Sequence, residues 1–204
     1  MDYDELEMKN LIEEIRKHVK KSVKKERYEH SVRTAEFSSR MGRIYQVDDT
    51  RCYLAGISHD ICKNLSDSEM LKLASRDGRA ISALEAENPQ LLHGRAAAVF
   101  MQEQFGVSDA EVLQAIASHT FGGAHLCPLA KILYAADKIE PGRPHVTSEY
   151  LEKLLKMDLD SLVAAIIKEN VAYLRSKGKT AAPATLEFLA ELTGESGDLN
   201  GNQA

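Results

Sequence analysis

Apolar residues recur at steps of three and four along most of this chain, which is the spacing of one face of an α-helix. Leu11, Ile15, Val19 and Val23 follow this spacing near the N-terminus. No segment shows the strict apolar–polar alternation of a β-strand, and no internal repeat is evident. The pattern predicts an all-α fold, a single helical bundle that occupies residues 1–190.

Residues that cap or stop helices mark the predicted boundaries. Ser66 and Glu69 have the spacing of a capping box, and Ser108 and Glu111 repeat it. The predicted helices span 4–25, 29–44, 50–62, 67–75, 79–87, 90–104, 109–119, 128–138, 148–156, 158–176 and 184–193. Residues 195–204 are polar and rich in Gly and Asn, so they predict a disordered tail.

The composition of the chain argues against several classes of function. The chain has 204 residues, of which 44% are hydrophobic, and a net charge of -5, which disfavours a protein that binds nucleic acid by neutralising phosphates. The acidic start, Met1–Glu5, lacks the pattern of a secretory signal, and no apolar run is long enough to span a membrane. Three cysteines without CxxC spacing predict free thiols. We expect a cytoplasmic protein without membrane or nucleic-acid partners.

Ligand-type side chains lie at or near the core-facing side of five predicted helices. Burying one such group is costly without a partner, although a single core histidine bonded to the backbone is common. Six on five helices are more economically explained if they surround metal. They are His30, His59, Asp60, His93, His119 and Asp137.

Four imidazoles and two carboxylates suit iron, manganese, cobalt or zinc, and the absence of cysteine ligands argues against a structural zinc site. Six side chains exceed what one catalytic ion needs and match two ions with one bridging aspartate. Such a pair activates water and polarises a phosphoryl oxygen, which predicts hydrolysis of a phosphate ester or anhydride.

Cations for the remaining phosphate charge are available close to these ligands. Lys63 follows the His59-Asp60 pair by one turn, and Arg143 lies in the rigid turn after Asp137. Arg27 precedes His30 by three residues and has two equally good interpretations, a phosphate ligand or an ion pair with a neighbouring acid.

The remaining candidates have weaker sequence signals. Arg95 is expected at the surface. His18, His125 and His145 lack apolar neighbours in register and are expected to be solvated, with His125 and His145 able to border a pocket mouth.

The order of these ligands resembles that of the HD-domain metal-dependent phosphohydrolases. The segments 27–31, 59–63, 92–94, 115–122 and 136–143 are similar to those of the bacterial YqeK-type family of symmetrical diadenosine-tetraphosphate hydrolases. The resemblance covers roughly residues 10–180. It implies the all-helical HD domain, an iron centre, and cleavage of diadenosine tetraphosphate at its central anhydride into two ADP.

The resemblance also implies roles for single residues. Asp60 would bridge the two ions. His30, His59 and Asp137 would complete the first site, and His93 and His119 the second. Asp60, Lys63 and His93 are then the predicted catalytic residues, and Arg27, Lys63, Thr120 and Arg143 the predicted phosphate ligands. A homodimer is one possible assembly.

Three alternatives stay open at this point. The same scaffold could serve another nucleotide phosphohydrolase or phosphodiesterase, because pocket walls and not metal ligands fix the substrate. A sensor would bind nucleotides at the metal without turnover. A plain helical interaction module would bind no metal.

Overall fold

Residues 4–194 are described by the computed structural model, and within that range the chain forms helices and loops without a strand. The α-helices are α1 (Glu5–Ser22), α2 (Lys25–Tyr45), α3 (Asp49–Ser58), α4 (Asp67–Ala74), α5 (Ala83–Glu87), α6 (His93–Phe105), α7 (Ala110–Ser118), α8 (Pro128–Ile139), α9 (Ser148–Leu154), α10 (Leu159–Ser176) and α11 (Pro183–Thr193). Two 3₁₀ turns, η1 (Ser75–Asp77) and η2 (Pro89–Leu92), lie between them. The all-α prediction is confirmed, and the predicted tail 195–204 lies outside the described residues.

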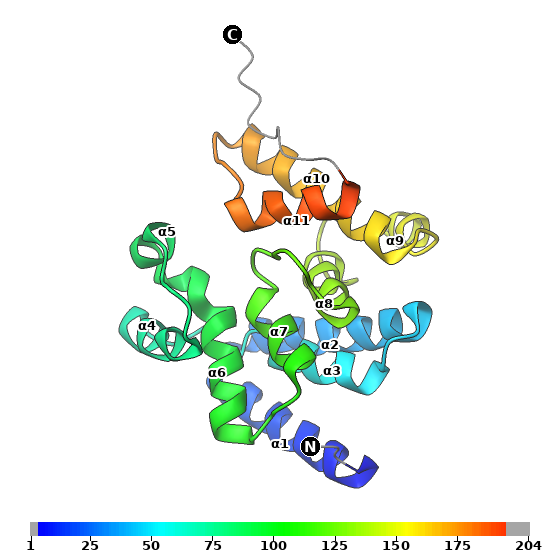
Figure 1. The fold of residues 1–204 in the computed structure, drawn as a ribbon. Coiled ribbons are helices and arrows are strands. Elements are labelled where there is room, and N and C mark those ends of the chain that lie inside the picture. The colour runs from blue at the N-terminus through cyan, green and yellow to red at the C-terminus, as the bar shows by residue number, and fades with distance from the viewer. Residues whose placement is uncertain (1–3, 195–204) are drawn as a thin grey trace.

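Helices α2, α3, α7 and α8 form the middle of the molecule (Figure 1), where α8 packs on the other three. α1 lies at one end and packs on α3, while α10 and α11 lie at the opposite end, where α10 packs on α8. Tyr134 of α8 and Phe188 of α11 are fully buried and meet edge to face, with ring centroids 5.4 Å apart. This contact joins the C-terminal helices to the central ones.

Two glycines let helices approach closely around the centre of the fold. A Cβ at Gly56 of α3 would lie 2.5 Å from the Cα of Ala35 in α2. At Gly94 of α6, a Cβ would lie 2.9 Å from the carbonyl oxygen of Ile116 and 3.0 Å from a ring carbon of His119. Both helix pairs therefore depend on the missing side chain.

The predicted helix 50–62 is wrong at its C-terminal end. α3 stops at Ser58, and residues 59–64 form successive tight turns, in which the N–H groups of Ile61 and Lys63 donate to the carbonyl oxygens of Ser58 and Asp60. The hydroxyl of Ser58 donates to the carbonyl oxygen of Leu54 at 2.7 Å, a bond that tends to bend a helix. The His59-Asp60 pair thus lies on a turn and not on a helix.

Side-chain caps mark the start of most of the other helices, and at α1, α4 and α5 the cap is a complete capping box. Ser66 and Glu69 form the predicted box at α4. At α7 the prediction is wrong, because Asp109 replaces Ser108 as the N-cap and accepts from the N–H groups of Glu111 and Val112. Among the helices of residues 4–194, none combines the length and apolar character that crossing a membrane requires.

Candidate metal centre

The six predicted ligands meet at one place, although they come from five segments of the fold. Five of them are buried, with at most 5% of the residue exposed, and the side chain of Asp137 is 16% exposed. They are His30 of α2, His59 and Asp60 of the turn after α3, His93 at the start of α6, His119 just after α7, and Asp137 of α8.

Three of the histidines are oriented by the same local bond. In each, Nδ1 lies close to the backbone carbonyl oxygen three residues earlier, at 2.7 Å for His59, 2.7 Å for His93 and 2.8 Å for His119. Because a carbonyl oxygen only accepts, Nδ1 must donate, and a neutral ring then presents an unprotonated Nε2. Metal-binding histidines are oriented in this way.

His30 is oriented instead by a buried carboxylate. Its Nδ1 lies 3.2 Å from Oε1 of Glu140, which is 1% exposed. Arg33 donates to the same carboxylate through Nε at 2.8 Å, and the N–H of Gly142 also donates to it. Burial alone would raise the pKa of Glu140, but the bond from Arg33 leads the contacts that lower it. An ionised Glu140 therefore holds the His30 ring with Nε2 facing the centre.

Asp60 faces two different pairs of imidazoles with its two oxygens. Oδ2 lies 3.3 Å from Nε2 of His59 and 3.9 Å from Nε2 of His30. Oδ1 lies 3.2 Å from Nε2 of His93 and 3.9 Å from Nε2 of His119. One carboxylate thus reaches both halves of the cluster, as a bridging ligand must.

The arrangement of acceptors in this cluster fits a bound cation. Nε2 of His93 and Nε2 of His119 are 2.9 Å apart, and Nε2 of His30 is 3.0 Å from Oδ1 of Asp137. Nε2 of His59 is buried without a hydrogen-bond partner among the described residues. Lone pairs that face one another at these distances repel unless a proton or a metal ion lies between them.

Within residues 4–194, two sets of three ligand atoms are close enough to hold an ion, with all atoms of a set within 4.8 Å of one another. One set is His30, His59 and Asp137, and the other is His59, Asp60 and His119. Imidazole and carboxylate ligands suit iron, manganese, cobalt or zinc.

Three of the ligands have protonation states that suit metal binding, whereas at His59 burial would lower the pKa but the contacts led by the charge of Asp60 raise it. Burial alone would raise the pKa of Asp60 and of Asp137, but their histidine neighbours, His59 and His30 respectively, lead the contacts that hold both pKa values well below the usual range. Burial, and then the charges of His59 and His93, hold the pKa of His119 well below its usual range. The carboxylates are therefore ionised and His119 is neutral, which are the forms that bind metal.

A cavity of about 200 Å³ opens beside the cluster, and all four predicted phosphate ligands line it: Arg27, Lys63, Thr120 and Arg143. Arg27 donates to Oδ2 of Asp60 at 2.9 Å, which confirms the ion pair with an acid and leaves its phosphate role a prediction. Arg143 donates to Oδ1 of Asp137 at 2.9 Å. Nζ of Lys63 lies 3.1 Å from Nδ1 of His93.

Three residues at the centre were not predicted from the sequence. Besides Arg33 and Glu140, Lys138 lies behind Asp137, where its Nζ is 3.7 Å from Oδ2 of that residue and donates to the carbonyl oxygen of His119 at 3.0 Å. It also lies 3.6 Å from the centre of the Tyr134 ring. The sequence signal for two of these residues was their position: Lys138 directly follows the predicted ligand Asp137, and Glu140 directly precedes the turn.

The other candidates lie outside the cluster. Arg95 is not at the surface as expected, because it is 7% exposed and donates to both oxygens of Asp77, at 2.7 and 2.8 Å. His18 is also not free in solvent, since it packs against Phe100 and Phe105. His125 is 93% exposed, as expected.

The match to known proteins agrees with this geometry. Residues 27–142 match the model of the HD domain, a segment that begins before His30 and ends after Asp137. The chain belongs to the HD-domain family. The buried cluster of histidines and aspartates described above can hold the metal on which this family depends.

Two curated relatives match this HD-domain protein over most of its length. A symmetrical bis(5'-nucleosyl)-tetraphosphatase of Staphylococcus aureus is 32% identical over 87% of this chain and 92% of its own. Another of the same name, from Halalkalibacterium halodurans, is 30% identical over 85% of this chain and 92% of its own. The crystal structure of a "predicted HD superfamily hydrolase involved in NAD metabolism" from Clostridium acetobutylicum superposes with a TM-score of 0.82. It is 28% identical and covers 89% of this chain and 96% of its own.

Proposed function

We propose that this HD-domain protein hydrolyses dinucleoside tetraphosphates symmetrically, releasing two ADP from diadenosine tetraphosphate at a dinuclear iron centre. The observation that carries the proposal is the position of Asp60, whose two oxygens face two separate pairs of imidazoles beside a cavity lined by cations. The names of the relatives in Staphylococcus aureus and Halalkalibacterium halodurans support the substrate and the symmetry of cleavage.

The ligands would divide between the two ions along Asp60. His30, His59 and Asp137 would hold one ion and His93 and His119 the other, with Asp60 contributing one oxygen to each. When bound, two such ions lower the pKa of water and neutralise charge on the phosphoryl oxygens. Imidazole and carboxylate ligation without cysteine agrees with iron, and manganese, cobalt and zinc are the competing ions.

Cations of the chain would place the phosphates. Lys63, Arg27 and Arg143 line the cavity from different segments, so they can contact more than one phosphate of a tetraphosphate. Thr120 adds a hydroxyl to the same wall. Because a terminal phosphate has a pKa near 6, a leaving ADP needs little protonation at neutral pH and a dedicated general acid is unnecessary. These cations and the hydroxyl then bind and orient the chain of phosphates, and the other two predicted catalytic residues, Asp60 and His93, would act at the reacting end as metal ligands.

Product analysis tests the proposal. Protein purified without oxygen is incubated with diadenosine tetraphosphate, and nucleotides are separated by chromatography. We expect ADP alone from the wild type, almost none from His59→Ala, and unchanged activity from the control His125→Ala, which removes an exposed histidine. AMP with ATP would show asymmetric cleavage and contradict the proposal.

Two other outcomes separate the alternatives. Turnover of another nucleotide in place of diadenosine tetraphosphate would indicate a different phosphohydrolase on the same scaffold. Tight nucleotide binding without turnover by metal-loaded protein would indicate a sensor. The homodimer and the cytoplasmic location expected from the sequence stay predictions.

A further inference from the structure

A second, larger cavity adjoins the candidate centre. It has a volume of about 600 Å³ and lies between the end of α8, the loop that follows it, α9 and α10. Arg143 lines both this cavity and the small cavity beside Asp60. Lys138, which contacts Asp137, is also part of its wall. A ligand that reaches the centre with its phosphates can therefore extend past Arg143 into this space, which we call the α10 pocket.

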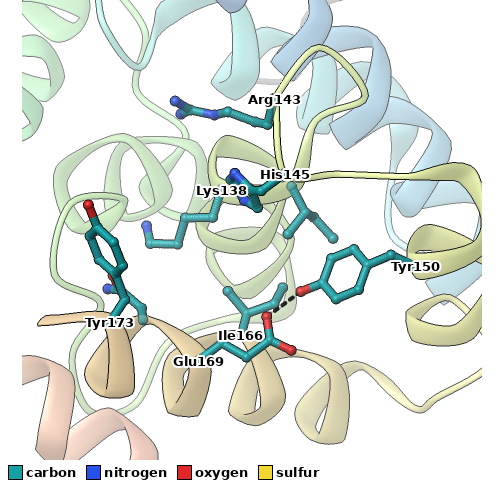
Figure 2. Close-up of a pocket in the computed structure, with 9 residues that line it drawn as sticks. Lys138, Arg143, His145, Tyr150, Ile166, Glu169 and Tyr173 are labelled. Carbon is teal, nitrogen blue, oxygen red and sulfur yellow. Dashed lines mark hydrogen bonds between the residues drawn. The ribbon is translucent and has the colours of Figure 1, made fainter. Parts of the chain in front are cut away.

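The charges of the α10 pocket are divided between its two sides. Lys138 and Arg143 enter from α8 and the loop after it, whereas Glu169 of α10 lies across the pocket (Figure 2). Tyr150 donates to Oε2 of Glu169 at 2.5 Å. A phosphate beside an ionised carboxylate would be repelled, so the phosphates belong on the side of the cations. A group that donates hydrogen bonds, as a sugar hydroxyl does, fits beside Glu169.

An exposed aromatic ring forms another part of the wall. Tyr173 is 61% exposed, although a ring of this size is normally more buried, and it extends from α10 toward the pocket (Figure 2). The side chain of Ile166 adds an apolar floor from the same helix. A flat ring at the rim of a pocket, next to an apolar surface, is a suitable stacking platform for a nucleobase.

We propose that the α10 pocket binds one nucleoside of the substrate, with the base stacked on Tyr173, the ribose hydroxyls facing Glu169, and the attached phosphates running past Arg143 to the centre. This inference deepens the proposed function and rests on it for the identity of the substrate. It assigns recognition of the nucleoside to a region distinct from the metal ligands. Phosphates alone would not use the pocket.

Calorimetric titration of metal-loaded protein with ADP and with pyrophosphate tests the proposal without relying on turnover. ADP has a nucleoside and pyrophosphate does not. We expect wild-type protein to bind ADP more tightly than pyrophosphate. Tyr173→Ala should weaken ADP binding about tenfold and leave pyrophosphate binding unchanged. Tyr173→Phe keeps the ring and should bind ADP like the wild type. Lys168→Ala, an exposed position on the same helix, is the control for substitution on α10.

Each possible result of this titration either supports or overturns the nucleoside site. Equal affinities of wild-type protein for ADP and pyrophosphate would overturn the nucleoside site, as would unchanged ADP binding in Tyr173→Ala. Equal weakening of both ligands in that variant would assign Tyr173 to the shape of the phosphate cavity and also overturn it. If the wild type fails to cleave diadenosine tetraphosphate but Tyr173→Ala still loses ADP selectively, the proposed reaction is wrong and the nucleoside site stands.

Discussion

The candidate metal centre and the α10 pocket share Arg143 but are built in opposite ways. At the centre, every imidazole is buried and oriented through Nδ1 by a second bond. In the α10 pocket, Tyr173 and His145 are exposed, and Glu169 is bonded to one neighbouring side chain, Tyr150.

This difference assigns separate tasks to the two regions. Groups that surround a reacting phosphate must be fixed before the substrate arrives, since reorganisation during the reaction raises the barrier. Groups that recognise a nucleoside can adjust as it binds. Substitutions at the centre should therefore lower metal content and kcat, whereas substitutions in the α10 pocket should raise KM.

Asp60→Asn should have the largest effect. It keeps the shape of the side chain but removes the charge shared by the two imidazole pairs, so metal content should fall and kcat should drop about a thousandfold. Elemental analysis and initial rates measure both. Asp160→Asn, which breaks an ion pair between a half-exposed Asp160 and Lys131, is the control and should be nearly silent. If Asp60→Asn changed KM alone, the distinction between the two regions would be lost.

Glu140→Gln should have the next largest effect, because it removes the negative charge that orients His30 and binds Arg33. Loss of such a supporting group costs about 10- to 100-fold in metal affinity or activity. Metal titration measures the affinity, and Glu152→Gln on an exposed face of α9 is the matched control. Lower stability with unchanged metal affinity would mean that Glu140 only anchors Arg33.

Tyr173→Ala should change a different kinetic constant. The KM for diadenosine tetraphosphate should rise about tenfold through lost stacking, with kcat nearly unchanged. Steady-state rates over a range of substrate concentrations measure this. A fall in kcat at constant KM would instead place Tyr173 with the reacting groups and contradict the comparison.

Lowering the pH should have the smallest of these effects. It should reduce the free energy of unfolding through Asp77, which lies outside both regions. Burial alone would raise the pKa of Asp77, but the bonds from Arg95 and Arg79 together lower it to about 2, below its unfolded value of about 3.9. The stabilisation is complete above about pH 4 and is lost as the pH falls toward 2, on the order of 1 kcal/mol after allowance for solvent. Chemical denaturation between pH 5 and 2 should show this loss in wild-type protein. If the free energy of unfolding of Asp77→Asn depended on pH in the same way as that of the wild type, this assignment to Asp77 would be contradicted.

The sequence was sufficient for the all-α architecture and for the convergence of the ligands, but not for the end of α3 or the cap of α7. Helical periodicity placed His30 and Asp137 on inward faces, where their side chains are 7% and 16% exposed, and polar groups out of solvent need partners, so the partners could be inferred. The capping box at Ser66 was likewise readable from spacing.

What the sequence could not supply depends on contacts between distant segments. The end of α3 at Ser58 reflects a side-chain bond that helical periodicity does not show. Arg95 is buried because Asp77 and Glu85 lie close to it in space. The roles of Arg33 and Glu140 depend on α2 and the end of α8 meeting, and the α10 pocket depends on α10 packing on α8. The pattern of residues along one sequence carries no signal for contacts between residues that lie far apart in that sequence.

The metal content of protein purified without oxygen tests the central claim most directly, because Asp60 is interpreted as joining two ion sites. Elemental analysis of the wild type should give about two iron ions per chain, and Asp60→Asn should lose metal while His125→Ala keeps it. One ion or none in active wild-type protein, or full metal content in Asp60→Asn, would contradict the two-ion centre.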